Sequence, residues 1–212
     1  MGVQDRKARE FARREREILD AALELLDQAE WQTVTVADIA KASEIGKGTI
    51  YKHFPSKETL YAQLSIDFGK DFYHTLTDQI DMQQPVIPLF RQLMERVWDL
   101  HLSGRKYHRL LLYCSAKDFR ARLPEAYRQE MINKDAAFES LFAGIITRGM
   151  EEGVFPRSVP VEEMMLAAHA VFEGAVAMLW NELEDDVDKK QFSQRITQFM
   201  LTGLCYMDRQ VG

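Results

Sequence analysis

The sequence predicts an all-α protein, and proline spacing and hydrophobic periodicity are the two observations behind this prediction. The six prolines of the 212-residue chain lie at positions 55, 85, 88, 124, 156 and 160, with long proline-free stretches between them. In those stretches the apolar residues recur at the helical spacing of three and four, and strict alternation is confined to Thr33–Val36. So short an alternating piece cannot seed a sheet. We therefore expect about nine helices and no internal repeat.

The first predicted helix has an apolar face that begins at Ile18, and a short helix follows it at Val36–Ser43. Thr35 precedes that short helix, and Asp38 stands three residues later, which is the spacing of a capping pair. Glu44–Gly46 then breaks the helix. This order of residues predicts a helix, a three-residue turn and a further helix.

The helix after the turn is predicted at Lys47–Phe54, and Pro55 stops it. Ser56 can cap the following helix, which begins at Lys57 and continues towards Asp81. Two helices of about eight residues separated by a short turn that contains glycine form a helix-turn-helix.

Three later stretches repeat the helical pattern, at Phe90–His101, Val161–Leu183 and Phe192–Gly203. The second of these is apolar on two sides, one lined by bulky residues and the other by small ones, which predicts burial on both sides. We expect the bulky side to face the core of the subunit and the small side to face a symmetry mate. The residues predicted for this dimer interface are Ala167, Ala170, Val171, Gly174, Ala175, Met178, Phe192 and Phe199.

Composition excludes several classes of protein. At 46% apolar and 28% charged residues, the chain has the composition of a globular domain with a sizeable core. Two cysteines are too few for a disulfide framework or a four-ligand metal site, and no cofactor motif is present. No uninterrupted apolar run approaches 18 residues and the first residues lack the pattern of a signal peptide, so we expect a cytoplasmic protein with no membrane partner.

The charge of the chain is uneven. The formal net charge of −6, from 27 basic and 33 acidic side chains, argues against nucleic acid when it is taken as a whole. The residues through Arg16, which we call the basic arm, carry six basic and three acidic side chains and so have a net charge of +3, leaving −9 on the rest. A basic arm on an acidic body indicates a local role for the positive charge, and a solvated helix face is the alternative.

The helix at Lys47–Phe54 has side chains suited to DNA. Ile50 and Phe54 are four residues apart and are predicted to face inward, which leaves the polar positions facing outward. Lysine neutralises phosphate charge, tyrosine and threonine donate hydrogen bonds, and glycine allows close approach of the backbone. The predicted outward set is Lys47, Gly48, Thr49, Tyr51, Lys52 and His53, with Lys57 in the first turn of the next helix.

The stretch Ile18–Leu60 resembles the N-terminal domain of the TetR family of bacterial transcriptional regulators. The most specific part of the resemblance is KGTIYKHF at Lys47–Phe54, followed by SKETL at Ser56–Leu60. The resemblance implies a symmetric dimer that places this helix in the major groove. It implies contacts to bases or nearby backbone for Gly48, Thr49 and Tyr51. It implies phosphate contacts for Thr35, Lys47, His53 and Lys57.

Two positions depart from the pattern of the family. Glu44 stands at a turn position that is commonly glycine, which is unfavourable for glutamate if its φ is positive. Gly46 stands where serine is frequent, and it can begin a helix but offers no hydroxyl group to DNA. Both departures make the preferred DNA sequence harder to predict.

The resemblance also implies two functional domains, a DNA-binding domain at residues 1–60 and an effector-binding and dimerisation domain at residues 61–212. Aromatic and histidine residues at helical spacing in the second domain could line an apolar cavity, although such residues more often belong to a core. The candidate effector-binding residues are Trp98, His101, Phe138, Phe142, His169 and Phe172. Their character favours a hydrophobic or amphipathic small molecule.

The sequence therefore predicts a ligand-responsive DNA-binding repressor rather than an enzyme. An all-α enzyme or a carrier of apolar small molecules, with an incidental helix-turn-helix, is the alternative. Neither would need the Lys47–Lys57 segment, and no metal-binding, nucleophile-elbow or phosphate-loop motif is present. A steep loss of DNA affinity with rising salt separates the predicted function from the alternative.

Overall fold

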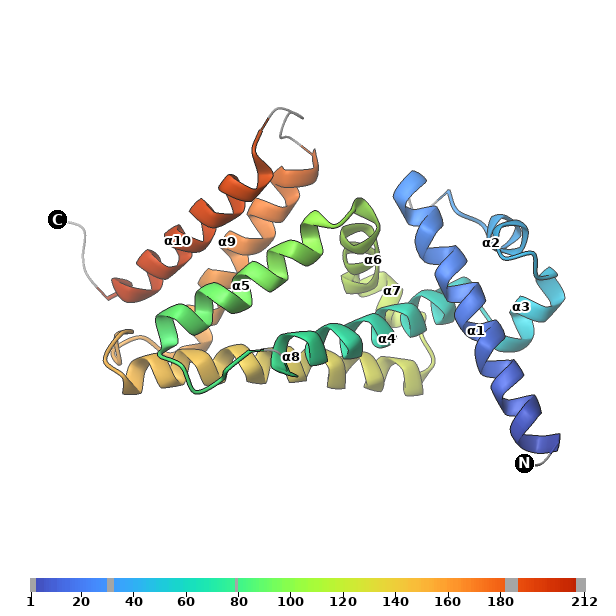
Figure 1. The fold of residues 1–212 in the computed structure, drawn as a ribbon, viewed down its shortest axis with the longest axis horizontal. Coiled ribbons are helices and arrows are strands. Elements are labelled where there is room, and N and C mark those ends of the chain that lie inside the picture. Colours follow the sequence, from blue (N-terminus) through green and yellow to red (C-terminus); the bar gives the residue numbers. More distant parts are fainter. Residues whose placement is uncertain (1–2, 30–32, 79, 182–186, 209–212) are drawn as a thin grey trace. The chain divides into compact units, whose positions relative to one another are not determined.

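The computed structural model describes residues 3–29, 33–78, 80–181 and 187–208, and these residues form ten α-helices and no strands (Figure 1). The prediction of an all-α chain is confirmed, and a helix of five residues contributes to the difference from the nine expected. The helices are α1 (Val3–Gln28), α2 (Val36–Ala42), α3 (Lys47–His53), α4 (Lys57–Asp78), α5 (Val86–Leu102), α6 (Arg105–Ser115), α7 (Lys117–Ala121), α8 (Glu125–Glu151), α9 (Val161–Asn181) and α10 (Lys189–Cys205).

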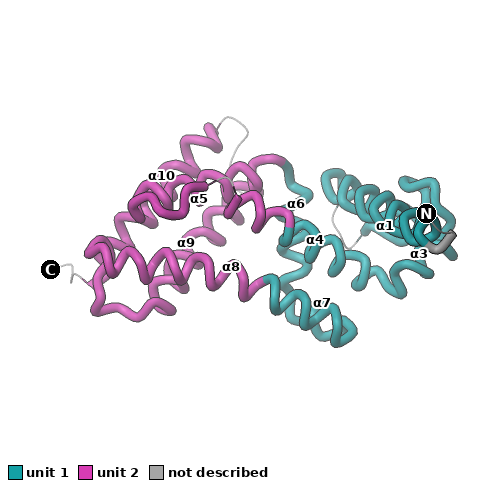
Figure 2. Tube along the Cα trace, turned by 60° about the horizontal axis from the view of Figure 1, so that its bottom comes forward, with its two compact units in different colours: residues 1–70, 104–134 teal, residues 71–103, 135–212 magenta. Residues whose placement is uncertain are grey.

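The helices divide into two compact units, which Figure 2 distinguishes by colour. Unit 1 consists of Met1–Lys70 and Gly104–Lys134, and unit 2 consists of Asp71–Ser103 and Asp135–Gly212. Helices α4 and α8 contribute to both units. This division describes packing, whereas the predicted division at residue 60 concerns function and stays a prediction.

The core of unit 1 joins the first helices to α6 and α7. Ile18, Ala22 and Leu26 of α1 are fully buried, and Leu110 of α6 and Phe119 of α7 belong to the same core. The later helices are therefore needed to cover α1, because α1, α2 and α3 alone would leave this face in water.

Polar contacts fix the end of α1 against the start of α6. The Lys106 backbone N–H donates to Asp27 Oδ1 at 3.0 Å, and Lys106 Nζ lies 2.5 Å from Glu24 Oε1. The Arg109 guanidinium donates to the Leu26 carbonyl at 2.6 Å, which satisfies an acceptor that the last turn of a helix leaves open. The same hydrogen-bonded pair with Glu24 raises the pKa of Lys106.

The division also changes the interpretation of the charge. Unit 1 contains 19 basic and 15 acidic residues, a net charge of +4, and unit 2 contains 8 basic and 18 acidic residues, a net charge of −10. Residues 104–134 alone contribute eight basic and three acidic side chains. The unit that contains the helix-turn-helix is therefore basic, although the whole chain is acidic.

The core of unit 2 lies between α5, α8, α9 and α10. Leu89 and Leu93 of α5, Leu179 of α9 and Leu201 of α10 are among its buried residues. Gly149 of α8 packs so closely on Phe155 that an added Cβ would lie 2.2 Å from the ring. Only glycine fits at this position without displacement of the ring.

The segment that connects α4 to α5 is held by one arginine of α8. The Arg148 guanidinium donates to the carbonyl groups of Met82, Gln83 and Gln84 and pairs with Glu152 at 2.7 Å. Glu152 in turn accepts from the Val86 backbone N–H at 2.9 Å, and this bond and the arginine lower the pKa of Glu152.

Helix α9 is the most apolar long helix of unit 2. Within the described residues, Val161–Trp180 is the segment whose length and mean hydropathy would suffice for a membrane span, and only 22% of that apolar window is buried. Glu162, Glu163 and Glu173 interrupt the segment, and α9 packs on α10. Much of the apolar surface of α9 is therefore exposed within one subunit.

Candidate nucleic-acid interface

Helix α3 presents one face to the core and the other to solvent. Ile50 and Phe54 are 1% and 2% exposed, which confirms that they pack inward. Lys47, Gly48, Tyr51 and Lys52 are exposed, with Tyr51 at 50%, and Thr49 is half-buried. A half-exposed tyrosine flanked by two lysines has the chemistry to contact both bases and phosphates.

The start of α3 is open to close approach. Gly46 is the N-cap residue and has no side chain to cap the helix. A Cβ built on Gly48 would meet nothing within 4 Å, so packing inside the protein does not require glycine there. A glycine that the fold does not need, on an exposed helix face, is free to bring the backbone close to a partner.

The turn before α3 is strained. Glu44 has a φ of 55°, and among the described residues it is the one non-glycine residue that adopts the left-handed conformation. Its N–H donates to the Lys41 carbonyl at 3.4 Å, while the Ile45 N–H donates to the Ala40 carbonyl at 3.1 Å. Glutamate is therefore held in a conformation that favours glycine, as the comparison with the family pattern suggested.

The start of α2 has a reciprocal capping arrangement. The Asp38 N–H donates to Thr35 Oγ1 at 3.2 Å, and the Thr35 N–H donates to Asp38 Oδ2 at 2.8 Å, so the predicted capping pair is confirmed. The Thr35 hydroxyl also donates to Asp38 Oδ2 at 2.6 Å. These hydrogen bonds, the hydroxyl one first, lower the pKa of Asp38. Thr35 is exposed, but its hydroxyl group is already engaged, so a phosphate contact would have to compete with the cap.

The start of α4 has a second such arrangement, which supports Lys57. The Thr59 N–H donates to Ser56 Oγ at 3.1 Å, and the Ser56 N–H donates to Thr59 Oγ1 at 3.1 Å, which confirms Ser56 as a cap. Lys57 Nζ lies 5.8 Å from the centre of the Tyr61 ring. Partial burial lowers the pKa of Lys57. Its position in the first turn of α4, near the positive end of the helix dipole, is favourable for an anion rather than a cation.

His53 differs from the other predicted phosphate contacts. Its side chain is only 4% exposed, its ring centroid lies 3.9 Å from that of Phe11, and its Nδ1 lies 3.5 Å from Glu15 Oε1. The ring is thus turned towards α1 rather than towards solvent. Nothing in the sequence pattern of α3 alone indicates this, because Phe11 lies far from it in sequence.

The basic arm is the first part of α1 and is helical from Val3. Its arginines make exposed pairs within the helix, with Arg13 2.7 Å from Glu17 and Arg14 3.0 Å from Glu10. The hydrogen bond with Arg14 is the main reason that the pKa of Glu10 is lowered. Exposed pairs of this kind are weak because water and salt screen them, so phosphate groups can replace the acidic partners at little cost.

Known proteins with similar sequences distinguish a transcriptional regulator from an enzyme. The family described as "Bacterial regulatory proteins, tetR family" matches residues 18–64, which span the end of α1, α2, α3 and the start of α4. The chain is a TetR family transcriptional regulator. Because this family consists of regulators, the enzyme alternative is excluded.

Relatives match over most of the chain. The uncharacterized HTH-type transcriptional regulator YhgD of Bacillus subtilis is 24% identical over 193 residues, which cover 90% of this chain and 96% of that protein. The HTH-type transcriptional repressor KstR2 of Rhodococcus jostii is 24% identical over 196 residues, which cover 90% of this chain and 91% of that protein.

Solved structures of other regulators share the fold. FadR of Bacillus subtilis in complex with stearoyl-CoA has a TM-score of 0.70 at 18% identity and covers 88% of this chain and 97% of its own. A regulator of Saccharomonospora viridis in complex with choline has a TM-score of 0.71 at 19% identity and covers 89% and 96%. The TetR fold therefore extends through both units of this regulator.

Three of the predicted effector residues of the regulator form one aromatic cluster in unit 2. The Phe172 ring lies 4.9 Å from Trp98 and 5.2 Å from His101, and both of these α5 residues are buried. Phe138 lies in a second cluster, 5.5 Å from Tyr73, and Phe142 packs against the same core.

His169, the remaining effector candidate, lies on the exposed side of α9. The structure does not bring it together with the Trp98 cluster. The bulky and the small apolar sides predicted for this helix adjoin each other. His169 lies where they meet and faces solvent.

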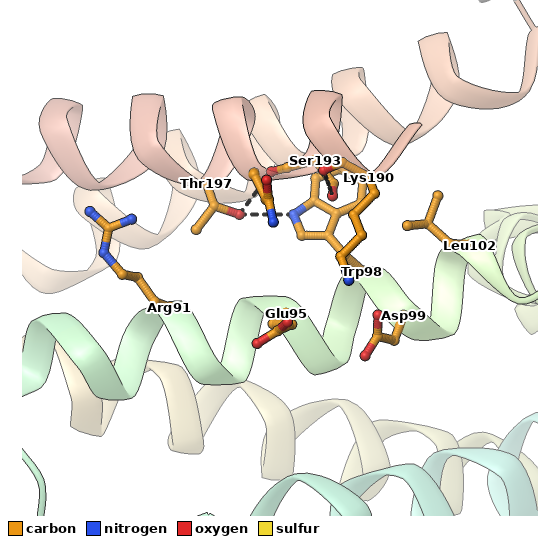
Figure 3. Close-up of a pocket in the computed structure, with 9 residues that line it drawn as sticks. Arg91, Glu95, Trp98, Asp99, Leu102, Lys190, Ser193 and Thr197 are labelled. Atoms are coloured by element: carbon orange, nitrogen blue, oxygen red, sulfur yellow. Dashed lines mark hydrogen bonds between the residues drawn. The ribbon is translucent and has the colours of Figure 1, made fainter. Parts of the chain in front are cut away.

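A cavity of about 350 Å³ lies beside this cluster, between α5 and α10 (Figure 3). The Trp98 indole N–H donates to Thr197 Oγ1 at 3.0 Å at its wall, and Ser193 and Thr197 are both buried. Four charged side chains also line it, Arg91, Glu95, Asp99 and Lys190, so this cavity is not apolar. Ser193 and Thr197 were not among the predicted effector residues, although two hydroxyl residues four apart on the buried face of α10 were a usable signal.

The residues predicted for the dimer interface separate into two groups. Ala167, Ala170, Gly174, Met178 and Phe199 are exposed, and Phe199 is 64% exposed. Ala175 is buried in the core of its own subunit, and Val171 and Phe192 are half-buried against that core. Leu166, which the prediction omitted, is 70% exposed and lies on the same side of α9 as Ala170.

In the described part of the chain, no three His, Cys, Asp or Glu side chains gather in the manner of a metal site. Cys114 is buried and its thiol donates to the Tyr61 carbonyl at 3.6 Å, whereas Cys205 is half-buried, and these two cysteines form no disulfide.

Proposed function

We propose that this regulator is a dimeric, cytoplasmic transcriptional repressor that a hydrophobic or amphipathic small molecule releases from its operator DNA. The exposed face of α3 carries the proposal. It combines a glycine that the fold does not require with a half-exposed tyrosine and two exposed lysines, inside a basic unit.

In the proposed complex, α3 enters the major groove. Gly48, Thr49 and Tyr51 meet bases or nearby backbone, and Lys47, Lys52 and Lys57 neutralise phosphates, with Thr35 at the start of α2 as a further backbone contact. We leave His53 out of this set because its ring faces α1. The positive charge of unit 1 attracts the duplex, and the acidic unit 2 disfavours non-specific coating of DNA.

The dimer would form through α9 and α10. Exposed apolar residues on both helices, Leu166 and Met178 on α9 and Phe199 on α10, form a surface that is costly to leave in water. Small residues between them, Ala170 and Gly174, allow close approach of a second helix pair. The dimer would place two copies of α3 about 34–36 Å apart, or a multiple of that distance, to match successive turns of DNA.

The effector would bind in unit 2, beside Trp98, His101 and Phe172. The aromatic cluster offers an apolar surface, and the neighbouring cavity adds charged and hydroxyl groups, a combination that suits an amphipathic molecule. The stearoyl-CoA bound to FadR is a molecule of this chemical type. Phe138 and Phe142 are secondary candidates in this proposal, and His169 is not part of it.

Binding of effector and of DNA would oppose each other. Helix α4 begins at the helix-turn-helix and ends in unit 2, so a change in its position in unit 2 also moves Lys57. An effector that prefers the conformation in which the two copies of α3 are wrongly spaced weakens DNA binding by some factor. DNA must then weaken effector binding by the same factor. In functional terms, residues 1–60 would bind DNA and residues 61–212 would bind the effector and dimerise.

The proposal is tested by identifying the molecule that purifies with the protein. Native mass spectrometry of the dimer is expected to show a retained ligand of amphipathic character, and adding that ligand should release a duplex selected from a random library. Trp98→Ala should weaken the release more than it weakens DNA binding in the absence of ligand. If Trp98→Ala remained a folded dimer but lost ligand-induced release and DNA binding equally, Trp98 would belong to the core only.

A further inference from the structure

The contact between the basic arm and the end of α3 gives His53 a role different from phosphate binding. Phe11, Glu15, Ile18, Ala22 and Leu26 follow one another at spacings of three and four and therefore lie on one face of α1. The last three of these are fully buried in the core of unit 1. Phe11 and Glu15 continue the same face beyond that core, and there they meet His53.

The His53 imidazole contacts α1 closely at its ring face, and its Nδ1 edge lies near a carboxylate without a hydrogen bond to it. The Phe11 and His53 rings are 3.9 Å apart at an interplanar angle of 32°, and the Glu15 carboxylate lies 3.5 Å from His53 Nδ1. The His53 side chain is 4% exposed, although Phe11 itself remains 48% exposed. Phe11 thus covers the imidazole with one face and leaves its other face to solvent.

Helix α3 needs such a support. It has seven residues and no side-chain cap at its start, and so short a helix is not stable without tertiary contacts. Ile50 and Phe54 attach one side of it to the core. His53 attaches its last turn to α1, next to the exposed Lys52.

We infer that His53 is a positioning residue, which fixes the basic arm and α3 to each other through its ring contact with Phe11 so that both meet DNA as one surface. This inference rests on the proposed function. It assigns to Phe11 a role that no phosphate contact could explain, because a phenyl ring donates no hydrogen bond and carries no charge. It also explains why a helical arm with exposed, weakly paired arginines keeps a defined direction relative to α3.

The test measures affinity and its salt dependence for the full-length dimer on a duplex selected from a random library. Removing a phosphate contact should reduce the slope of log affinity against log salt by about 0.9 for each contact, whereas loss of positioning leaves the slope unchanged. Lys52→Ala, at the neighbouring exposed position, is the reference for a reduced slope. His53→Phe is the decisive variant, because it keeps a ring that can stack on Phe11 but cannot bind phosphate.

We expect His53→Ala and Phe11→Ala each to weaken binding by about two- to tenfold, the range of an aromatic pair, with unchanged slopes. The double variant should bind no more weakly than the weaker single variant, and His53→Phe should bind within about twofold of wild type. Circular dichroism and melting establish that each variant is folded. If His53→Ala does not fold, Phe11→Leu and His53→Phe complete the same comparison.

Two results would overturn the inference. One is a reduced salt slope in both His53→Ala and His53→Phe, and the other is strict additivity of the Phe11 and His53 variants. If wild-type protein selects no duplex, the proposed function fails and the inference fails with it. If wild type binds normally and the two variants are additive, only the inference fails.

Discussion

Replacing Gly48 by alanine separates the stability of the fold from the binding of DNA. In the free protein the added Cβ would meet nothing within 4 Å, and Gly48 is not among the residues with positive φ. A compatible glycine-to-alanine change stabilises a protein by about 0.4–1 kcal/mol, chiefly by restricting the unfolded chain. At about 2–4 °C per kcal/mol for a chain of this size, the melting temperature should rise by about 1–4 °C.

On DNA the same methyl group should be harmful. If the backbone of α3 touches the duplex at Gly48, the methyl group overpacks that contact, which costs about 1–3 kcal/mol and corresponds to about five- to 150-fold weaker binding. Fluorescence anisotropy with a selected duplex measures this loss, and differential scanning calorimetry measures the stability.

Gly144→Ala is the matched control for this experiment. Gly144 is also helical, and its added Cβ also meets nothing within 4 Å, but it lies in unit 2. It should raise the melting temperature and leave DNA affinity unchanged. The reasoning would be refuted if Gly48→Ala bound DNA as tightly as Gly144→Ala, or if Gly48→Ala were less stable than wild type.

Three further predictions concern other parts of the account. Glu44→Gly should stabilise the protein by about 0.5–1 kcal/mol in urea unfolding. The change removes a left-handed conformation that costs about 1–2 kcal/mol, and the greater backbone entropy of glycine in the unfolded chain offsets part of this gain. A stability no higher than that of Glu44→Ala would contradict this prediction. Phe199→Asp should convert the dimer to folded monomers in sedimentation equilibrium, and an unchanged dimer mass would count against the proposed interface. The pKa of Asp38 is lower in the folded than in the unfolded protein, so its ionised form stabilises the fold above the unfolded pKa, and this stabilisation is lost as the pH falls through the folded pKa. Asp38→Asn should therefore flatten the decline in the free energy of unfolding below about pH 4. A pH profile identical to that of wild type would argue against the capping role.

The helix-turn-helix could be predicted in detail because its signals are local. The capping pairs at Thr35 and Ser56, the stop at Pro55 and the inward pair Ile50 and Phe54 each depend on residues within a few positions of one another. Glu44 could be identified as strained for the same reason. The place of His53 could not be predicted, because it depends on Phe11, which is more than 40 residues away in sequence.

The C-terminal helices were harder to orient. In α9 nearly every position is apolar or small, so the sequence does not decide whether Ala175 or Ala170 faces the subunit core; the structure buries the first and exposes the second. In α10 the buried face includes Ser193 and Thr197, whose hydroxyl groups are satisfied by hydrogen bonds. Polar residues with partners inside the helix, or on another helix, cannot be told from solvent-facing ones by hydrophobicity alone.

The charge of the chain shows the same limit. The basic arm is visible in the sequence, but the eight basic residues of 104–134 join the unit that contains the helix-turn-helix only because α6 and α7 pack on α1. Net charge is informative for the surface that meets the partner, and assigning residues to that surface requires the fold.

The central claim is that the exposed face of α3 selects the DNA sequence, and Tyr51 tests it most directly. Wild-type protein should bind a selected duplex at least about a thousandfold more tightly than a scrambled duplex, with affinity for both falling steeply as salt rises. Tyr51→Ala, with its side chain half exposed and outside the core, should remain a folded dimer, keep its affinity for the scrambled duplex and lose most of the preference. An unchanged preference in Tyr51→Ala would contradict the account.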